Sequence, residues 1–535
     1  MENLENGSIK KKEHSTIVTF TVPLSFLNVY RDTEINTKFF NKSSKRKLIE
    51  EDLKLTSTEK ILEAKIYVES CIKKGICDPL LFFNYGFILK KMGKLKEAKK
   101  YLNKSIQLNP DFAEAYTNLS NLLIELDSLH EAEKSIRKAI KLKPFLSESH
   151  ATLGVILRTL DRLDEAEVHA RKAIKLKPTN LNALLNLGNI LKDLGKLEQA
   201  EIYIRKAIQI DPKSAEAYFN LATIELFQGN YESGFKHYEF RHIKNKPNFP
   251  HANPRIKKIT NQEINAEEKL LVISEQGLGD TLQYMRYIPL LRARNIDFSF
   301  CAQTKLHKLI KISKIDENPL TTEQANKVSE GKWISLLSLP NYLKINPISQ
   351  GNYQPYIKSK DELITKWKRI LSAEKKPIIG INWQGNISME KRTYKGRSIP
   401  LETFSKIINK NEISFLSLQK GFGSEQLDHC SFKNKFVRCQ DQINSAWDFL
   451  ENAAIIENCD LIITCDTSIA HLAGGMGKKV WLLLKKVPFW TWGVEGESTF
   501  WYPSMRLFRQ KEKNNWQEVM QRVADTLYKE FRNRV

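Results

Sequence analysis

The first half of the chain carries a pattern of small and large apolar positions that recurs every ~34 residues, a spacing typical of helical repeats. Small residues fill two positions of each copy where two helices would cross closely: Ala98, Ala132, Ala166 and Ala200, and Ser105, Ala139, Ala173 and Ala207. Large apolar residues share another position: Leu119, Leu153, Leu187 and Leu221. A proline closes each copy: Pro110, Pro144, Pro178 and Pro212. A fixed period of this length predicts consecutive helix–turn–helix units.

Glycine marks the first predicted helix of three copies, where a neighbouring backbone is expected to approach. Gly86, Gly154 and Gly188 hold this position, and Ser120 takes it in the second copy. The pattern extends beyond the four complete copies. A fifth copy begins at Ala215 and changes after Tyr218, and a half-copy over 59–74 is predicted before the first.

This pattern resembles the tetratricopeptide repeat in its length, its Gly and Ala positions and its closing proline. One unit cannot bury its apolar face alone, so the copies are expected to stack into an α-helical superhelix with an extended concave surface. Residues 48–246 are therefore predicted to bind a peptide or protein in that groove. The alternative is a spacer that holds or dimerises the domain that follows. Residues 1–47, rich in Lys and Asn, are predicted to form a poorly ordered or loosely docked arm.

The helical pattern stops at Pro247–Pro254, where three prolines close together favour extended turns. Beyond this point short β-rich runs alternate with amphipathic helical stretches, which predicts parallel α/β units. The runs form two series, at 269–274, 297–302 and 333–337, and then at 377–382, 413–418, 460–465 and 479–484. Two doubly wound lobes are therefore predicted, over 255–370 and 375–535.

Composition argues against some classes of protein but does not identify a ligand or a reaction. The formal charge of +22 favours anionic partners, but the simpler explanation is a composition bias spread over solvated helix faces. The seven cysteines form no Cys-x-x-Cys pair, which argues against a disulfide framework or a structural zinc site. No apolar run reaches the length of a membrane span, and Met1–Ser15 is polar. A cytoplasmic protein without a transmembrane segment is expected.

Three polar loops follow predicted strands, at the strand ends where ligands of parallel sheets bind. The first, Gln276–Asp280, offers backbone N–H groups at Gln276, Gly277 and Gly279 and a helix start capped by Asp280. It has only two glycines, so it is not a dinucleotide-binding fingerprint. A plain capped turn is the alternative interpretation.

The second loop, Asp466–Gly475, places hydroxyl groups and small residues at the first turn of a predicted helix. Unpaired N–H groups and the positive end of the helix dipole suit a phosphate there. We interpret it as a diphosphate site rather than a simple capping box. His471, one turn further on, is either part of that site or a satisfied core histidine.

The third loop, Asn382–Asn386, leads into the basic run Glu390–Ser398. Cationic side chains beside a phosphate cradle can neutralise a departing diphosphate without a metal ion. A solvated charge run is the alternative. The sequence contains no Asp-x-Asp motif and no His/Cys cluster at metal-ligand spacing, so no metal or other cofactor is expected.

These loops also carry a family resemblance. The residues concerned are Gly277–Asp280, Asn382–Asn386, Arg397–Leu401, Ser417–Gly421, Asp466–Gly474 and, in the tail, Trp501–Gln510. They resemble the GT-B glycosyltransferases of the heptosyltransferase-like group. Repeats followed by such a domain are similar in arrangement to the protein O-GlcNAc transferases.

The resemblance implies two Rossmann-like lobes that transfer a sugar, with inversion, from a nucleotide diphospho-sugar to a hydroxyl acceptor. Asp280 would be the general base. The residues placed at the substrate are Gln276, Gly277, Gly279, Gln384, Arg397, Gln419, Lys420, Asp466, Thr467, Ser468 and His471. Among them Thr467, Ser468 and His471 would grip the diphosphate, with Gln384 and Arg397 nearby, and Gln419 and Lys420 would lie close to the nucleotide base.

Two positions depart from the group's usual pattern. An acidic residue is usual where Phe489 stands, and an arginine where Thr491 stands. The departures favour a second hypothesis, a protein-interaction scaffold whose repeats work beside a catalytically silent α/β part. A nucleic-acid binder would rest on charge alone, with no recognisable motif.

Overall fold

The computed structural model describes residues 58–259, 264, 268–350, 354–390, 395–408 and 413–531. The chain divides into two compact units, one ending at Asn220 and the other beginning at Leu221. The division falls inside helix α11 (Ala215–Phe227), so the end of the repeat pattern belongs to the second unit. The arm expected over residues 1–47 lies outside the described residues.

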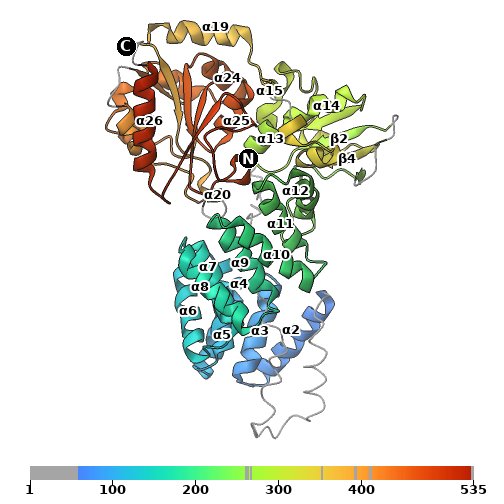
Figure 1. The fold of residues 1–535 in the computed structure, drawn as a ribbon. Coiled ribbons are helices and arrows are strands. Elements are labelled where there is room, and N and C mark those ends of the chain that lie inside the picture. Colours follow the sequence, from blue (N-terminus) through green and yellow to red (C-terminus); the bar gives the residue numbers. More distant parts are fainter. Residues whose placement is uncertain are drawn as a thin grey trace, which may run out of the picture. The chain divides into compact units, whose positions relative to one another are not determined.

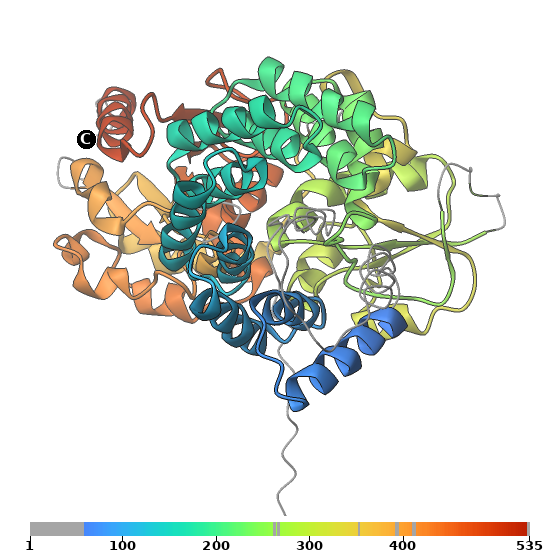
Figure 2. The same ribbon diagram turned by 90° about the horizontal axis from the view of Figure 1, so that it is seen from below.

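Paired helices form the first unit, and their starts keep the period of the sequence (Figures 1 and 2). The first helices of the successive pairs are α3 (Pro79–Lys91), α5 (Ala113–Glu125), α7 (Ser147–Thr159), α9 (Leu181–Asp193) and α11. The second helices are α4 (Leu95–Leu108), α6 (Leu129–Leu142), α8 (Leu163–Leu176), α10 (Leu197–Ile210) and, already in the second unit, α12 (Tyr231–Tyr238). Helix α2 (Thr58–Lys73) coincides with the predicted half-copy. The helix–turn–helix prediction is confirmed.

The small residues lie where the two helices of each pair cross. Ala98, Ala132, Ala166 and Ala200 have no exposed surface. A Cβ atom added at Gly86 would lie 3.3 Å from the carbonyl oxygen of Ala98, and one at Gly188 would lie 3.4 Å from that of Ala200. Ser120, at the same position in the second copy, donates a hydrogen bond of 2.8 Å to the Ala132 carbonyl instead. The facing helix therefore approaches this position closely, and in the second copy the side chain bonds its backbone.

Equivalent glycines in neighbouring repeats give a matched stability prediction. A Cβ atom at Gly188 would lie 2.4 Å from Cδ1 of Ile204, whereas the nearest atom at Gly154 is 3.4 Å away. Gly188→Ala is expected to destabilise the first unit by about 1–3 kcal/mol through overpacking. Gly154→Ala should be neutral or stabilise by up to ~1 kcal/mol, since alanine is the better helix former. Thermal unfolding followed by circular dichroism checks this, and equal shifts for both variants would contradict it.

The second unit contains two parallel sheets, as the alternating pattern predicted. The first has the strand order β1-β4-β2-β3. Its strands are β1 (Lys257–Lys258), β2 (Leu270–Ile273), β3 (Phe298–Cys301) and β4 (Lys332–Ser335). The three predicted runs of the first series contain or overlap β2, β3 and β4, and β1 is a short edge strand that the pattern did not reveal.

The second sheet has the order β6-β5-β7-β8-β9, and all its pairings are parallel. Its strands are β5 (Ile378–Asn382), β6 (Ser414–Ser417), β7 (Leu461–Cys465), β8 (Val480–Leu484) and β9 (Met505–Arg509). Strands β5 to β8 are buried throughout, which explains why they read as continuous apolar runs. The four predicted strands are present, and β9 is additional.

Helices connect or follow the strands of both sheets. In the first half of the unit these are α13 (Leu278–Tyr284), α14 (Ile288–Ala293), α15 (His307–Ile312), α16 (Thr322–Asn326), α17 (Leu339–Tyr342) and α18 (Pro347–Gln350). In the second half they are α19 (Asp361–Ile370), α20 (Ile387–Glu390), α21 (Ser405–Ile408), α22 (Gln426–His429), α23 (Gln440–Ser445), α24 (Phe449–Glu457), α25 (Ser468–Gly475) and α26 (Trp516–Phe531). Helix α26 packs beside the second sheet (Figure 1), where Val519, Val523 and Leu527 join its core.

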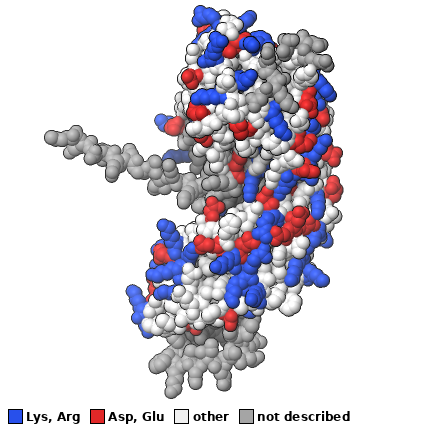
Figure 3. All heavy atoms as spheres, turned by 90° about the vertical axis from the view of Figure 1, so that its left-hand side faces the viewer, with Lys and Arg blue, Asp and Glu red and all other residues white. Residues whose placement is uncertain are grey.

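Acidic and basic side chains alternate over the face of the molecule drawn in Figure 3. Between consecutive repeats, Lys143 pairs with Glu114 and Lys177 pairs with Glu148. On this face the positive charge is spread rather than gathered, which fits the interpretation of solvated helix faces. No helix in the described part of the chain is long and apolar enough to cross a membrane.

Candidate functional site

The first predicted loop joins the end of β2 to α13, and it is a capped turn. The backbone N–H of Gly277 donates a hydrogen bond of 2.9 Å to Oδ2 of Asp280. The backbone of Gln276 has a φ of 61°. This left-handed conformation costs a side-chain-bearing residue energy. The capped-turn alternative is thus realised in the geometry. It does not exclude chemistry, because the electrostatics of Asp280 are unusual for a cap.

Burial raises the pKa of Asp280 to about 6, and the negative charges of Glu275 and Asp466 add to the rise, while the hydrogen bond from Gly277 opposes it. An ordinary capping aspartate on a protein surface stays ionised far below this pH. A carboxyl group with a pKa near 6 is ionised at neutral pH and still basic enough to accept a proton from a reacting hydroxyl.

The second loop begins α25, and Thr467 is its N-cap residue. Its hydroxyl donates a hydrogen bond of 2.8 Å to Oδ1 of Asn382, the last residue of β5. Thr464, at the end of β7, donates to the same oxygen at 3.2 Å. The N-terminus of α25 is thereby fixed against the neighbouring strand, with Ser468 in its first turn.

Helices α13 and α25 lie side by side (Figure 1), and this brings the first two loops together. A Cβ atom added at Gly279 would lie 3.0 Å from Cδ2 of His471 and 3.6 Å from Cα of Ser468. Any larger residue at Gly279 would therefore push the helices apart. Asp280, the next residue, stands beside the first turn of α25. The carboxyl group of Asp280 and the N-terminus of α25 are therefore neighbours in the candidate site.

His471 is a buried, neutral side chain at the contact between α13 and α25. Its Nδ1 lies 2.9 Å from the Tyr502 hydroxyl, and its ring stacks on Trp492 with centroids 5.3 Å apart. Burial, helped by the charge of Arg286, lowers the pKa of His471 to about 3. It would therefore meet a phosphate as a neutral hydrogen-bonding group rather than as a cation.

Arg397 supplies positive charge near the same place. Its Nε donates to Oε1 of Glu390 at 3.2 Å. Burial opposes its charge, but Asp466 and Glu390 hold its pKa above the usual value. A Cβ atom at Gly385 would lie 2.4 Å from Nη2 of Arg397, so the glycine of the third loop makes room for the guanidinium. Residues 391–394 of the basic run lie outside the described residues.

Asp466 connects this cation to the second loop. Burial raises its pKa, while Arg397, a hydrogen bond from Trp492 and the charge of Lys485 oppose the rise. Lys485 follows β8 directly, and its Nζ also donates to the Lys395 carbonyl at 3.0 Å. Sequence reasoning missed Lys485, although its place after a buried strand was the signal used for the other loops.

Gln419 lies inside the second half of the unit rather than on its surface. Its Oε1 accepts from Asn382 Nδ2 at 2.8 Å and from the backbone N–H groups of Trp383 and Gln384 at 3.2 and 3.0 Å. Its Nε2 donates to the carbonyls of Gln384 and Phe422. With all these bonds and 3% exposure, Gln419 acts as a brace for the third loop.

The other residues of that region differ in how they are held. Gln384 Oε1 accepts a hydrogen bond of 2.8 Å from Gln426. Lys420 Nζ donates to the carbonyl of Ile443, and burial lowers the pKa of Lys420 to about 8. Because its charge is weakened by burial, a nearby anion would strengthen its protonation.

The segment with the two departures also reaches the site. Thr491 is buried in η10 (Trp490–Trp492), and the next residue, Trp492, bonds Asp466 and stacks on His471. Phe489 packs on Trp490 with ring centroids 5.6 Å apart. Aromatic side chains thus flank Thr491 on both sides in this segment. Within the described ranges, no three His, Cys, Asp or Glu side chains are grouped so that they could hold a metal ion.

The helices of the first half of the chain are tetratricopeptide repeats, and a parallel α/β unit follows them. Tetratricopeptide-repeat models match residues 81–112, 113–145, 147–180, 181–214 and 203–234. These matches confirm the repeat prediction.

Among curated proteins, the chain is similar to protein FlbA of Caulobacter vibrioides, with 23% identity over 57% of this chain and 54% of FlbA. It thus spans about half the length of that relative. Among solved structures, YrrB, described as a TPR protein with an unusual peptide-binding site, is 21% identical and aligns with 32% of this chain and 89% of its own, at a TM-score of 0.27. TTC0263, described as a thermophilic TPR protein of Thermus thermophilus, is 19% identical over 30% of this chain and 88% of its own, at a TM-score of 0.29.

Proposed function

We propose that the second unit is an inverting, metal-independent glycosyltransferase of the GT-B type. It would move a sugar from a nucleotide diphospho-sugar to a hydroxyl group. The observation that carries this proposal is the contact of α13 with α25, which sets Asp280 beside the first turn of α25. Such a transfer needs one base on the acceptor side and a positive site for the departing diphosphate, and these are the two groups that meet there.

In this mechanism the carboxylate of Asp280 removes the proton of the acceptor hydroxyl. The acceptor oxygen attacks the anomeric carbon of the donor sugar from the face opposite the diphosphate. The bond between that carbon and the β-phosphate oxygen breaks, and the diphosphate leaves with the electron pair. The N–H groups at the start of α25 and the charges of Arg397 and Lys485 would stabilise the leaving group.

The repeats would bring the acceptor, as a peptide or protein. Repeats of this kind suit such a role because their first helices offer a continuous row of equivalent positions. Asn118, Thr152 and Asn186 stand one repeat apart from each other in one such row. In the described part of the chain, the buried amide nitrogen of Asn186 has no hydrogen-bond partner. A main-chain carbonyl of a bound peptide would satisfy it. Sequence analysis missed this row, which the period could have revealed.

A panel of nucleotide sugars tests the enzymatic proposal with the purified full chain. At one hundred times its dissociation constant, a donor should stabilise the second unit by about 2.7 kcal/mol and raise its melting temperature. The same donor should release nucleoside diphosphate when an acceptor is present. Thr467→Val should weaken the binding. If no donor shifts the melting curve and none is consumed, the protein is a scaffold and the proposal is wrong.

A further inference from the structure

Arg241 and Glu275 form a buried ion pair behind the loop that carries Asp280. Arg241 belongs to η3 (Glu239–His242), the turn that follows the last helix of the repeat pattern, and Glu275 directly follows β2 and Ser274. Both side chains have 0% exposure. Nη2 and Nε of Arg241 donate to the two carboxylate oxygens of Glu275 at 2.6 and 3.1 Å. Such a two-pronged pair fixes orientation as well as distance.

A second contact holds the next residue of the loop. Gln276 Nε2 donates a hydrogen bond of 3.3 Å to the Tyr238 hydroxyl. Tyr238 lies one helical turn before Arg241, and the guanidinium stands 4.8 Å from the centre of its ring. Tyr238 and Arg241 thus hold two consecutive loop residues. The second of these, Gln276, has the positive φ, a conformation that persists only where its surroundings impose it.

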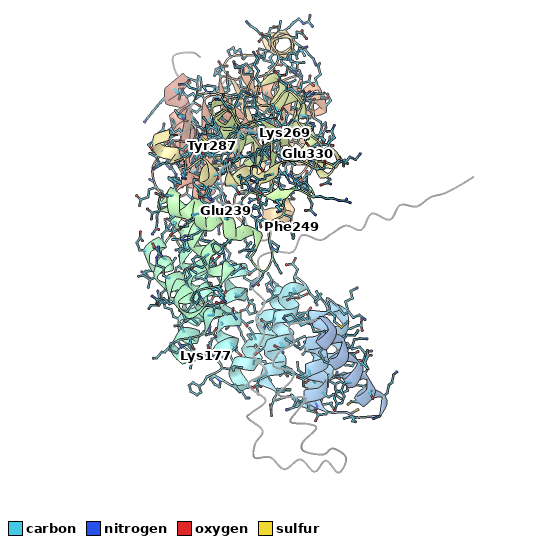
Figure 4. All side chains as sticks on the ribbon, turned by 90° about the vertical axis from the view of Figure 1, so that its right-hand side faces the viewer. Lys177, Glu239, Phe249, Lys269, Tyr287 and Glu330 are labelled. Atoms are coloured by element: carbon cyan, nitrogen blue, oxygen red, sulfur yellow. The ribbon has the colours of Figure 1, made fainter. Side chains whose placement is uncertain are left out.

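Neighbouring contacts make this grip rigid. Arg241 also donates to Ser338 Oγ at 2.8 Å and to Glu239 Oε1 at 2.9 Å. Figure 4 labels Glu239 on this turn. On the other side, the backbone N–H of His251 donates to the Ser274 carbonyl at 2.9 Å. The loop before α13 is therefore clasped by the segment that ends the repeats.

We propose that Arg241 is a positioning residue for Asp280, so that the turn ending the repeat pattern is a working part of the active site rather than a tether. The idea rests on the proposed function. Two residues separate the gripped pair, Glu275 and Gln276, from the Gly279–Asp280 step that packs on α25, so a shift of the loop would move Asp280 relative to the diphosphate site. A misplacement of about 1 Å can cost a hundredfold in rate.

Single and double variants of the ion pair can separate a positioning role of Arg241 from a contribution to stability alone. Removing one partner of a buried ion pair leaves an unpaired charge and is strongly destabilising. Replacing both partners by apolar residues of similar volume is often neutral or stabilising. The double variant Arg241→Met/Glu275→Met therefore keeps the fold and removes the grip. The single variants Arg241→Met and Glu275→Met measure the destabilisation, and Arg158→Met is a control that breaks an ion pair with Asp193 in the repeats.

The experiment measures three quantities on the full chain. The first is amide hydrogen exchange over residues 276–284, which should rise about tenfold in the double variant as the loop opens more often. The second is kcat for transfer, which should fall tenfold or more. Its pH profile should also move to lower pH, because a loop that opens more often exposes Asp280 and weakens the burial that raises its pKa. The third is the affinity for nucleoside diphosphate, which should not change. Arg158→Met should change none of them.

The outcomes separate the two proposals. A stable double variant with native exchange, kcat and pH profile would show that the pair is only structural, and would overturn the inference. Loop exchange that rises as expected, in a protein that consumes no nucleotide sugar, would show that the pair holds the loop, but would refute the enzymatic proposal and with it the catalytic part of the inference. Faster exchange with an unchanged kcat in an active enzyme would also overturn the inference.

Discussion

Replacing Asp280 by asparagine is expected to lower kcat for sugar transfer by about 10²–10⁴-fold, the range that a general base contributes. The affinity for the donor should remain, because the diphosphate would bind to α25 and the cations around Asp466. Asparagine has the shape of aspartate, and its side-chain oxygen can still accept the 2.9 Å hydrogen bond from the Gly277 N–H. The variant therefore removes the base and keeps the cap.

The pH profile of the wild type gives an independent check on the same residue. The pKa of Asp280 is raised to about 6, so the carboxyl is protonated and inactive below that pH and ionised above it. We expect kcat/KM to rise tenfold per pH unit below about 6 and to level off above it. This rising limb should be absent from any residual activity of Asp280→Asn.

Asp316→Asn is the matched control. Asp316 lies in a loop, and its Oδ2 accepts a hydrogen bond of 3.0 Å from the N–H of Phe300 in β3. This variant should lose some stability and keep the wild-type rate and pH profile. An Asp280→Asn enzyme with the wild-type rate would exclude Asp280 as the base and would move the search to another acceptor-side group.

The repeats could be predicted in detail because their information is local and periodic. Each copy repeats the same close-packed position, so Gly86, Ser120, Gly154 and Gly188 identify one another. The buried parallel strands were equally visible as short apolar runs between helices. The edge strand β1 has only two residues, one of them exposed, and carries no such signal.

The candidate site was predictable only in part. The positions of the three loops were predictable, because each follows an apolar strand. Ligands of parallel sheets bind at the carboxyl ends of the strands, where such loops lie. What the sequence does not contain is the direction of a side chain. Gln419 was expected near a nucleotide base, which stays a prediction, and the bonds by which its amide holds the third loop were not foreseen. The partnership of Arg241 with Glu275 was hidden for the same reason, since no local pattern links two residues in different elements.

Loss of the Gln419 amide is the second change expected to have a large effect. Gln419→Leu would leave three donors without their acceptor: Asn382 Nδ2 and the backbone N–H groups of Trp383 and Gln384. Each buried polar group left unsatisfied costs about 1–3 kcal/mol. The carbonyls of Gln384 and Phe422 would lose a donor as well. We therefore expect a loss of several kcal/mol in the free energy of unfolding of the second unit.

Donor binding should weaken together with stability, because the brace holds Asn382, and Asn382 holds the Thr467 hydroxyl at the start of α25. A displacement of Asn382 would break its hydrogen bond with Thr467 and free the N-terminus of α25, where we expect the diphosphate to bind. Each loss of about 1.4 kcal/mol in binding free energy raises the dissociation constant about tenfold. Calorimetric titration with a nucleoside diphosphate, at a temperature where the variant is still folded, measures the effect.

Gln440→Leu separates the two consequences. Gln440 is also a buried glutamine, and its amide exchanges hydrogen bonds of 2.8 and 3.1 Å with the backbone of Ser417 in β6. Its remaining bond goes to Asn444 in its own helix, so the variant should lose stability and keep its donor affinity. If both variants lower the affinity for the donor equally, then general loosening of β6 explains the effect and Gln419 has no special role. A strong loss of affinity in Gln419→Leu alone would mean that the amide network between β5, β6 and α25 shapes the diphosphate site.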